Sequence, residues 1–375
     1  MEKKYERVWA EISLDNIEHN YLEMKKKVGR EVAGIVKANA YGHGAKQVAQ
    51  RLERAGCRFF CVASLAEAIE LRECVSSPIL ILGYTPPEQT DELIENDIIQ
   101  SAANFEAAKS FSAEAVKLGK KLKVHIKLDT GMGRTGFNCR DAEKADLARI
   151  AEAARLPGLD VGGVFTHFPV SDEADGAEYT KAQYERFAGT VKKLEELCGL
   201  KFAVKHCANS GALVNCDYTY MDMVRPGIAL YGCFPGSEAQ GLELRPAMEL
   251  KTRVIQVSDF EDGETVGYGR TWKAQGKRRI AVISAGYADG FSRRFSNNRE
   301  VIIRGKRVQV VGRVCMDLAM IDVTDIKDAR VGDTVTLIGR DGEEFISADE
   351  YAASAGTISY EMLCAVSARV PRYYE

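Results

Sequence analysis

The sequence lacks the features that mark membrane, secreted or nucleic-acid-binding chains. No apolar run approaches the roughly 18 to 20 residues that a bilayer-spanning helix needs, and the opening MEKKYERVWAEI has no apolar signal-peptide core. The net charge is only −3, from 51 basic and 54 acidic residues, so no broad basic surface is available for a phosphate backbone. We therefore expect a cytoplasmic protein without membrane or nucleic-acid partners.

Metal-ligand spacing is missing as well. The 10 cysteines lie singly, several of them inside apolar runs such as FFCVAS, and no CxxC pair occurs. The 5 histidines, at positions 19, 43, 125, 167 and 206, show no metal-ligand pattern. We expect reduced core thiols and no bound metal.

The composition that remains is that of a globular, enzyme-sized chain. Hydrophobic residues make up 46% and charged residues 28% of the 375 positions, the usual balance of a soluble protein. This length predicts two or three folding units. Composition alone names no function.

Eight short apolar runs recur between residue 32 and about residue 230, with helical or mixed stretches between them. They are VAGIV, FFCVAS, PILILG, IIQSA, KVHIKLD, VGGVFTH, AVKHCANS and the MVRPGIALYG region. Apolar strands alternating with helices are typical of parallel strands buried on both faces, and eight such units match a (β/α)8 barrel of the TIM type. On periodicity alone, a doubly wound sheet is the alternative. A helix is expected over residues 14–28, and Ser64 to Glu67 forms a capping box before another.

After about residue 245 the pattern changes to closely spaced β-rich runs. Turn signals separate them at residues 262–263, 304–306 and 341–342, as in a mostly antiparallel β domain. The turn-rich PGSEAQGLELRP predicts the boundary, with a barrel over residues 1–242 and a β domain over residues 243–375. The first 12 or so residues are expected to pair with the β domain.

Lys37 ends the first apolar run, and barrel enzymes carry their chemistry at the carboxyl ends of strands. A partly desolvated lysine there can form a Schiff base with a carbonyl cofactor. A solvated strand-end lysine is the alternative. Tyr41, Gly42 and Gly44 follow, with a hydroxyl and close backbone approach suited to a phosphate.

Later strand ends carry further polar groups. Arg134 lies in a glycine-punctuated loop after Lys127, where it is suited either to grip a carboxylate or phenolate or to form a structural ion pair. His167 ends the VFTHF run, as an orienting group or a satisfied core histidine. The last two loops carry Asn209-Ser210-Gly211 and Arg225-Pro226-Gly227-Ile228, and backbone N–H groups of such late loops bind phosphate in barrels. Together these residues predict a site for a phosphate-bearing cofactor.

Nine motifs occur in an order that resembles the bacterial alanine racemases. They are GIVKANAYGHG, LDTGMGRTGF, THF, HCANS, MVRPGIALYG, VGYGRTW, GYADGFSR, GRVCMDLAMIDV and TISYE. Each motif is weak by itself, but the ordered set covers nearly the whole chain and is highly specific. The resemblance implies an enzyme that interconverts L- and D-alanine with pyridoxal phosphate and supplies D-alanine for peptidoglycan.

The resemblance also implies the two bases. Lys37 matches the lysine that holds the cofactor, and after substrate exchange it serves one face of the substrate α-carbon. Tyr268, in the β domain, matches the base of the other face. A phenol ionises near pH 10 in water, so this role requires a polar, cationic neighbourhood, which His167 and nearby arginines match in the family.

The remaining roles are carried over from the family in the same way. Arg225 matches the contact to the cofactor's pyridine nitrogen, Arg134 matches the contact to its phenolate oxygen and to the substrate carboxylate, and the backbone N–H of Met316 matches a further substrate contact. Lys127 matches a lysine that is often carbamylated. The cofactor set, beyond Lys37, is completed by His167, Tyr41, Asn209, Ser210, Gly227, Ile228 and Tyr360. The family builds each site across a head-to-tail homodimer.

Three related functions stay open. A racemase for serine, or for several amino acids, is the nearest alternative, although the bulk of Tyr360 favours the methyl group of alanine. A decarboxylase of the same fold would carry a carboxylate where Arg225 stands. A non-catalytic cofactor-binding barrel would lack residues 246–375.

Overall fold

The computed structural model describes residues 5–141, 145–234 and 241–375, in two compact units. The barrel unit comprises the described residues of Ile17–Ala40 and Ala45–Arg245. The β unit comprises those of Met1–Asn16, Tyr41–Gly44 and Pro246–Glu375. Each unit has its own sheet and is described by itself.

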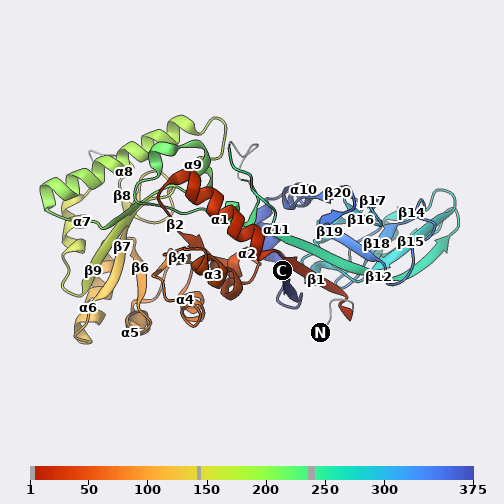
Figure 1. Cartoon of the computed structure of the whole chain (residues 1–375), viewed down its shortest axis with the longest axis horizontal. Coiled ribbons are helices and arrows are strands. Elements are labelled where there is room, and N and C mark those ends of the chain that lie inside the picture. The colour runs from red at the N-terminus through yellow and green to blue at the C-terminus, as the bar shows by residue number, and fades with distance from the viewer. Residues whose placement is uncertain (1–4, 142–144, 235–240) are drawn as a thin grey trace. The chain divides into compact units, whose positions relative to one another are not determined.

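Short buried strands build the barrel unit (Figure 1). They are β2 (Glu31–Val32), β3 (Gly34–Ile35), β4 (Phe60–Val62), β5 (Ile79–Ile81), β6 (Ile98–Ala102), β7 (Leu122–Asp129), β8 (Phe137–Asn138), β9 (Leu159–Phe165), β10 (Val204–His206) and β11 (Met223–Val224). Their order is β2-β11-β10-β9-β7-β6-β5-β4-β3, all parallel, and β8 adds to β7 outside this path.

This path starts and ends on one short segment of the chain. Only Ala33 separates β2 from β3; its N–H donates to Val224 O on one side, while the N–H of Gly34 donates to Phe59 O on the other. Residues 31–35 therefore act as one strand that joins both ends of the sheet. When β2 and β3 are counted as one strand, the 9 strands of the path become eight. The predicted (β/α)8 barrel is therefore confirmed, and the doubly wound sheet is excluded.

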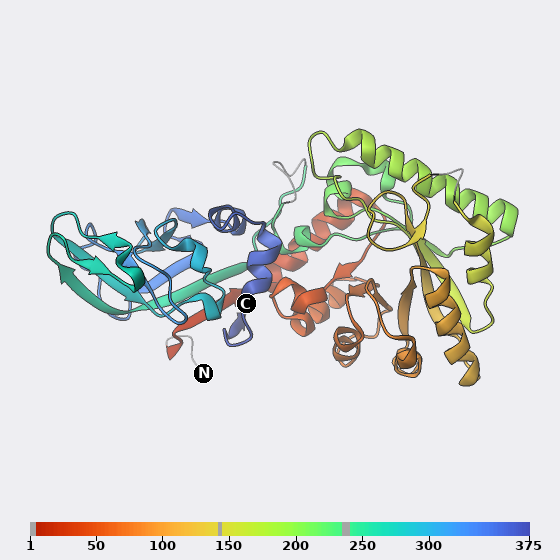
Figure 2. The ribbon, with the colours of Figure 1, turned by 180° about the vertical axis from the view of Figure 1, so that it is seen from behind.

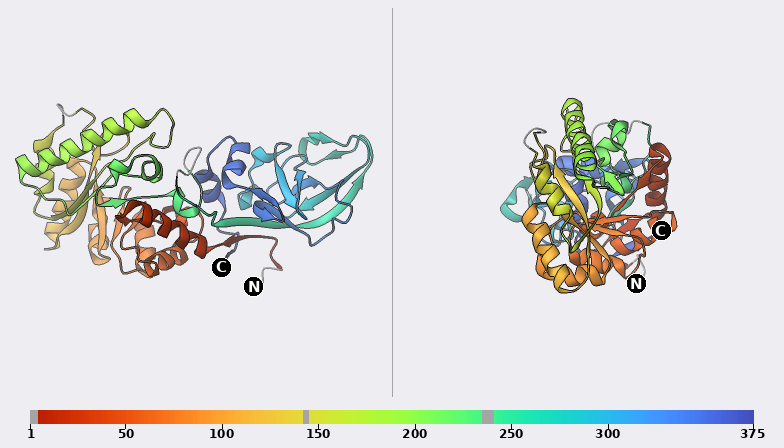
Figure 3. Two further views of the ribbon diagram at one scale, coloured as in Figure 1. Left: turned by 45° about the horizontal axis from the view of Figure 1, so that its top comes forward. Right: turned by 90° about the vertical axis from the view of Figure 1, so that its left-hand side faces the viewer.

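Helices surround these strands, as the end-on view in Figure 3 shows. They are α1 (Leu14–Val28), α3 (Ala45–Arg54), α4 (Leu65–Arg72), α5 (Thr90–Glu95), α6 (Phe105–Lys117), α7 (Leu147–Ala154), α8 (Ala177–Cys198) and α9 (Ser210–Asn215). The helix predicted over residues 14–28 is α1. Ser64 caps α4 as predicted, accepting from the backbone N–H of Glu67 at 3.4 Å.

The β unit is mostly antiparallel (Figure 2). Its strands are β1 (Val8–Ile12), β12 (Met248–Phe260), β13 (Thr265–Val266), β14 (Trp272–Lys273), β15 (Arg278–Ile283), β16 (Glu300–Ile303), β17 (Lys306–Gln309), β18 (Ala319–Asp322), β19 (Thr334–Asp341), β20 (Glu344–Ile346) and β21 (Arg372–Tyr374). β1 pairs antiparallel with β12 and parallel with β21, so the first strand of the chain belongs to this sheet.

Two helices also lie in the β unit, where the sequence showed almost no helical periodicity. They are α10 (Ala348–Ser354) and α11 (Ser359–Ala365). At 7 residues each, they are too short for periodicity to reveal them. Among the described residues of both units, no helix has the length and apolar character needed to cross a membrane.

Candidate active site

The predicted cofactor residues of the barrel unit all lie at the carboxyl end of its parallel strands. Because the strands run in one direction, these ends share one rim of the barrel. In chain order, the rim carries Lys37 after β3, Lys127 within β7 and Arg134 after it, His167 after β9, Asn209 and Ser210 after β10, and Arg225, Gly227 and Ile228 after β11.

Lys37 is followed by a turn of left-handed helix. The φ angles are 52° at Ala38, 52° at Asn39, 54° at Ala40 and 52° at Tyr41, within α2 (Lys37–Tyr41). Residues other than glycine rarely adopt this conformation, because Cβ approaches the following carbonyl oxygen. Such backbone strain concentrates at functional sites, where surrounding contacts maintain it.

Side-chain acceptors support this turn from outside it. One carboxylate oxygen of Glu67 accepts from the N–H of Ala38 at 2.7 Å, and the other accepts from Ala63 N–H, also at 2.7 Å. Asn39 Oδ1 accepts from Ala45 N–H at 2.8 Å. Glu67 thus ties the end of β4 to the residue after Lys37, a role that its place in a capping box did not predict.

Lys127 and Arg134 belong to one loop system. Lys127 Nζ donates to Thr135 Oγ1 at 2.7 Å, and Asp129 Oδ1 accepts from the backbone of Gly131 and Gly133 at 3.1 and 3.0 Å. Burial, together with the positive charges of Arg134 and Arg225, lowers the pKa of Lys127 to about 8. Arg134 is exposed and forms no ion pair with any residue that the structure describes, which favours the ligand-binding interpretation over a structural ion pair.

Arg225 is buried and bound entirely by neutral acceptors. Its Nη1 donates to His206 Nδ1 at 2.8 Å, and its Nη2 donates to the carbonyl oxygens of Thr166 and Cys207 at 2.7 and 3.2 Å. His167 Nδ1 lies 3.4 Å from the same Nη2. No carboxylate among the described residues pairs with Arg225, and its Nε has no hydrogen-bond partner there.

His167 faces this arginine as a neutral ring. Burial holds the pKa of His167 well below its ordinary value, and the charges of Arg225 and Arg134 push it further down. Because Arg225 can only donate, His167 Nδ1 accepts, and the ring proton is left on Nε2. His167 is therefore a hydrogen-bond donor, and the positive charge of the rim comes from the arginines and lysines.

Ser210 connects the last two loops. Its Oγ accepts from the N–H of Gly227 at 2.8 Å and of Ala229 at 3.4 Å, so its hydroxyl proton is free to donate elsewhere. Among the described residues, the N–H groups of Ser210 and Ile228 have no acceptor. Asn209 instead caps α9 through Ala212 N–H at 3.0 Å and donates to Phe168 O at 3.0 Å. Asn209 therefore positions the loop, while Ser210 and Ile228 offer donors to an anion.

The remaining predicted cofactor residues, Tyr41 and Tyr360, lie together in the β unit, with ring centroids 6.0 Å apart. Gly42, interpreted from the sequence as a phosphate-contacting position, packs against α11. A Cβ there would meet Leu363 O at 2.3 Å, and Arg372 Nε donates to Gly42 O at 3.1 Å. Close packing against α11 explains this glycine.

Tyr268 and Met316 are exposed on the β unit, at 72% and 54%. Gly267 and Gly269, on either side of Tyr268, pack against Arg313. Met316 O accepts from Ala288 N–H at 3.0 Å, whereas the Met316 N–H has no acceptor among the described residues. Both groups predicted to reach a substrate are thus available to a ligand.

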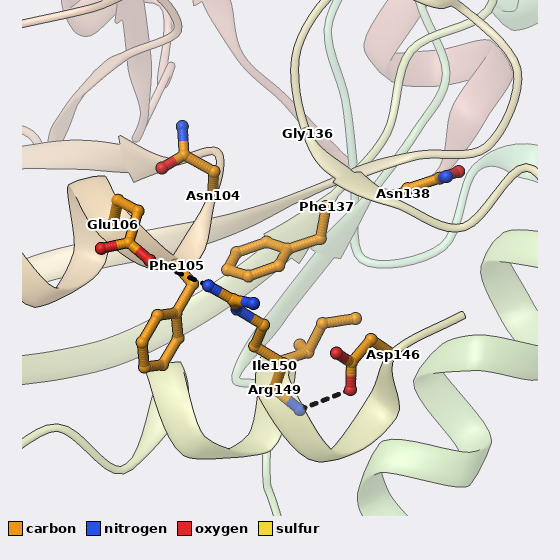
Figure 4. Close-up of a pocket in the computed structure, with 9 residues that line it drawn as sticks. All are labelled: Asn104, Phe105, Glu106, Gly136, Phe137, Asn138, Asp146, Arg149 and Ile150. Atoms are coloured by element: carbon orange, nitrogen blue, oxygen red, sulfur yellow. Dashed lines mark hydrogen bonds and ion pairs between the residues drawn. The ribbon is translucent and has the colours of Figure 1, made fainter. Parts of the chain in front are cut away.

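A hollow of about 430 Å³ lies elsewhere in the barrel unit, near the starts of α6 and α7 (Figure 4). Its charged side chains are occupied, because Arg149 donates to Glu106 at 2.8 Å and the side chain of Asp146 caps α7 through Arg149 N–H at 3.0 Å. None of the residues predicted for the site lines it. The lining consists of Asn104, Phe105, Glu106, Gly136, Phe137, Asn138, Asp146, Arg149 and Ile150.

The cysteines and the possible metal ligands are other candidate reactive groups within the described residues. All 10 cysteines are free, and those at 57, 61, 139, 207, 216 and 233 are buried. No group of three or more His, Cys, Asp or Glu side chains within the described ranges is arranged to hold a metal ion. The barrel has a cationic rim, and the same chain carries an antiparallel β domain. This combination defines a two-domain barrel enzyme that binds an anionic small molecule.

Comparison with known proteins gives the family. The alanine racemase N-terminal domain matches residues 12–235, and the alanine racemase C-terminal domain matches residues 247–374. An alanine racemase of Clostridium perfringens is 46% identical over 372 residues, covering 98% of this chain and 95% of that protein. The chain belongs to the alanine racemase family and is an isomerase, an amino-acid racemase of the pyridoxal-phosphate-dependent class.

Solved structures agree with this assignment. Alanine racemase from Clostridium difficile 630 is 40% identical, with a TM-score of 0.92 over 99% of this chain and 96% of that one. Alanine racemase from Bacillus anthracis, solved with bound L-Ala-P, is 38% identical, with a TM-score of 0.90 over 99% and 95%.

Proposed function

We propose that the chain interconverts L- and D-alanine by a two-base mechanism, with pyridoxal phosphate bound at the barrel rim. The observation that carries this proposal is the bonding of Arg225, a buried arginine whose partners are neutral and which has no carboxylate beside it. A decarboxylase of the same fold would place a carboxylate here. The L-Ala-P bound to the Bacillus anthracis relative supports alanine as substrate.

The polar groups of the rim fit such a cofactor. The N–H groups of Ser210 and Ile228, with the Ser210 hydroxyl, are suited to the phosphate, and Gly227, Tyr41 and Tyr360 complete the proposed phosphate set. Asn209 shapes the loop, and Arg225 Nε would face the ring nitrogen. Lys37 would hold the cofactor through its amine. When bound, pyridoxal phosphate withdraws electrons from the substrate α-carbon, which makes its proton removable.

The two bases act on opposite faces of that carbon. Lys37 Nζ removes or returns the proton on one face, and Tyr268 Oη does so on the other. The Nε2–H of His167 is suited to donate to the Tyr268 oxygen and so to favour its ionised form. Arg134 would hold the substrate carboxylate and the cofactor phenolate oxygen, with the Met316 N–H as a second carboxylate donor.

We further propose that Tyr268 and Met316 serve a site on a second copy of the chain, in a head-to-tail homodimer. Their exposure on the β unit supports this arrangement, because a base that acts on substrate must be screened from water in the working enzyme. A cytoplasmic enzyme that supplies D-alanine to peptidoglycan is the proposed biological setting.

Lys127 is the proposed site of carbamylation. Its pKa of about 8 leaves a reactive fraction of neutral amine near pH 7. The amine nitrogen attacks CO2, a C–N bond forms and a proton is released. The resulting anion would interact electrostatically with the positive charge of Arg134 and would orient that arginine.

Parallel racemisation assays test the proposed function. The loss of optical rotation is followed for L-alanine and L-serine with the cofactor-loaded protein. We expect alanine to turn over faster, because the bulk of Tyr360 leaves little room beyond a methyl group. Faster turnover of serine would overturn the substrate assignment, and decarboxylation without racemisation would overturn the reaction.

A further inference from the structure

We propose that His125 is a positioning residue for Arg225, acting through His206 at the end of a one-way hydrogen-bond chain inside the barrel. His125 lies in β7, His206 ends β10, and Arg225 directly follows β11. The proposal rests on the proposed function only where Arg225 is said to face the cofactor. The chain of hydrogen bonds itself lies wholly in the barrel unit.

The geometry joins the three side chains in sequence. Arg225 Nη1 lies 2.8 Å from His206 Nδ1, and His206 Nε2 lies 3.0 Å from His125 Nδ1. All three residues are buried, at 4%, 0% and 2% exposure. Bulk water therefore cannot replace a missing partner.

The chemistry of arginine fixes the direction of this chain. A guanidinium has only donors, so His206 Nδ1 must accept and carry no proton. A neutral His206 then carries its proton on Nε2 and donates it to His125. His125 Nδ1 must accept in turn, which leaves the proton of His125 on Nε2. Arg225 thus determines the tautomers of two histidines, the second of which it does not touch.

The side chains and backbone around the two histidine rings leave space for both of them. His206 stacks on Phe165 with a centroid separation of 4.9 Å and an interplanar angle of 6°, and His125 stacks on Phe59 at 5.8 Å and 30°. Gly163 in the neighbouring strand is required here, because a Cβ on it would lie 2.6 to 2.7 Å from three atoms of the His125 ring. The barrel wall thus leaves room for a ring at position 125.

The charge state of the rings agrees with this direction. Burial, with the charge of Arg225, lowers the pKa of His125 to about 4 and holds that of His206 well below its ordinary value. Both rings are neutral at pH 7, as the chain requires. A proton added to His125 Nδ1 would place two donors face to face at His206 Nε2.

Removing the His125 Nδ1 acceptor should therefore disturb the hydrogen bond that Arg225 Nη1 donates. Without His125 Nδ1, the proton on His206 Nε2 is either buried without a partner or moves to Nδ1, where it opposes the Nη1 donor of Arg225. Either result weakens the bond that fixes the Arg225 side chain. Phenylalanine at position 125 keeps a ring but no acceptor, and asparagine keeps an acceptor near the place of Nδ1.

The first test is independent of cofactor and of activity. In cofactor-free protein labelled with 15N-histidine, NMR at pH 7 should show both His125 and His206 protonated on Nε2 and unprotonated on Nδ1. Single substitutions assign the signals. A charged His206, or a proton on its Nδ1, would overturn the proposal even if the enzyme racemises alanine normally.

The second test compares His125→Phe with His125→Asn. We expect His125→Phe to weaken pyridoxal-phosphate binding, measured by absorbance titration, on the order of tenfold, the effect of one unpaired buried donor. His125→Asn should restore most of the affinity. In a His206→Phe background, which has no Nε2 proton to satisfy, His125→Phe should have little further effect. Equal losses in both backgrounds, or no rescue by asparagine, would reduce His125 to a packing residue.

Should His125→Phe fail to fold, the NMR measurement on the unmodified protein still decides the proposal. If the tautomers are as expected but no racemisation occurs with any amino acid, the proposed function fails while the positioning role of His125 stands.

Discussion

An alanine-to-glycine substitution in the left-handed turn after Lys37 should raise the free energy of unfolding, whereas in an ordinary right-handed helix it lowers it. Ala38 is exposed and has a φ of 52°, so its methyl group contributes strain without burying apolar surface. A non-glycine residue in this region costs roughly 1–2 kcal/mol. Glycine removes that strain but loses roughly 0.5–1 kcal/mol of chain entropy on folding. We therefore expect Ala38→Gly to raise the free energy of unfolding by about 0.5–1 kcal/mol.

The matched control is Ala113→Gly. Ala113 is also exposed, but it lies in the interior of α6, a right-handed helix. Glycine there should lower the free energy of unfolding by about 1 kcal/mol. The same chemical change thus has opposite signs at two exposed alanines of the barrel unit.

Urea denaturation checks this comparison, with cofactor and protein concentrations held constant, because both ligands and subunits stabilise the folded state. The unfolding midpoint of Ala38→Gly should lie above that of the parent, and that of Ala113→Gly below it. A midpoint that falls for both variants would refute the inference that the turn is strained.

Four further outcomes are expected. Lys37→Ala should purify without the yellow colour of bound cofactor and lose at least about 100-fold in racemisation; a yellow variant racemising at the native rate would remove Lys37 from its role. Tyr268→Phe should impair solvent deuterium incorporation far more from one enantiomer of alanine than from the other, whereas equal retention would rule out a one-face role. Glu67→Gln should lower the urea midpoint, because the two carboxylate oxygens of Glu67 each accept from a backbone N–H, and the glutamine amide keeps one acceptor but puts a donor in place of the other; an unchanged midpoint would contradict the support assigned to Glu67. Stability should fall as the pH drops from about 6.5 toward 4, since His125 has a folded pKa of about 4 and the unfolded chain takes up the proton first; urea midpoints across this range should fall less steeply for His125→Phe.

The barrel was predictable because its signal is local. Each of the eight apolar runs contains one strand of the ring, and parallel strands place their carboxyl ends on one rim. Lys37 and Arg225 could therefore be assigned to one rim from sequence alone. Tyr268 could not, since a tyrosine in the short connection between β13 and β14 has no sequence pattern of its own, and its role depends on family resemblance.

The sequence could not predict contacts that depend on distant partners. No glycine marks the left-handed turn at residues 38–41, and its support comes in part from Glu67 on another helix. The pairing of His125 with His206 joins residues 81 positions apart, each in a run whose periodicity reports only strand burial. The helix α11 approaches the backbone of Gly42 closely, a contact between distant residues that helical periodicity does not record.

The position of β1 has a consequence for synthesis. This strand is synthesised well before both of its partners, β12, which starts at Met248, and β21, which ends at Tyr374. At a synthesis rate of roughly 5–20 residues per second, many seconds pass between the synthesis of β1 and that of β21, its second pairing strand, so one edge of β1 stays unpaired during this time. The barrel segments are all made during this interval. An open strand edge is a site for pairing with other chains, so the period before residue 374 emerges is when the nascent chain is most exposed to aggregation.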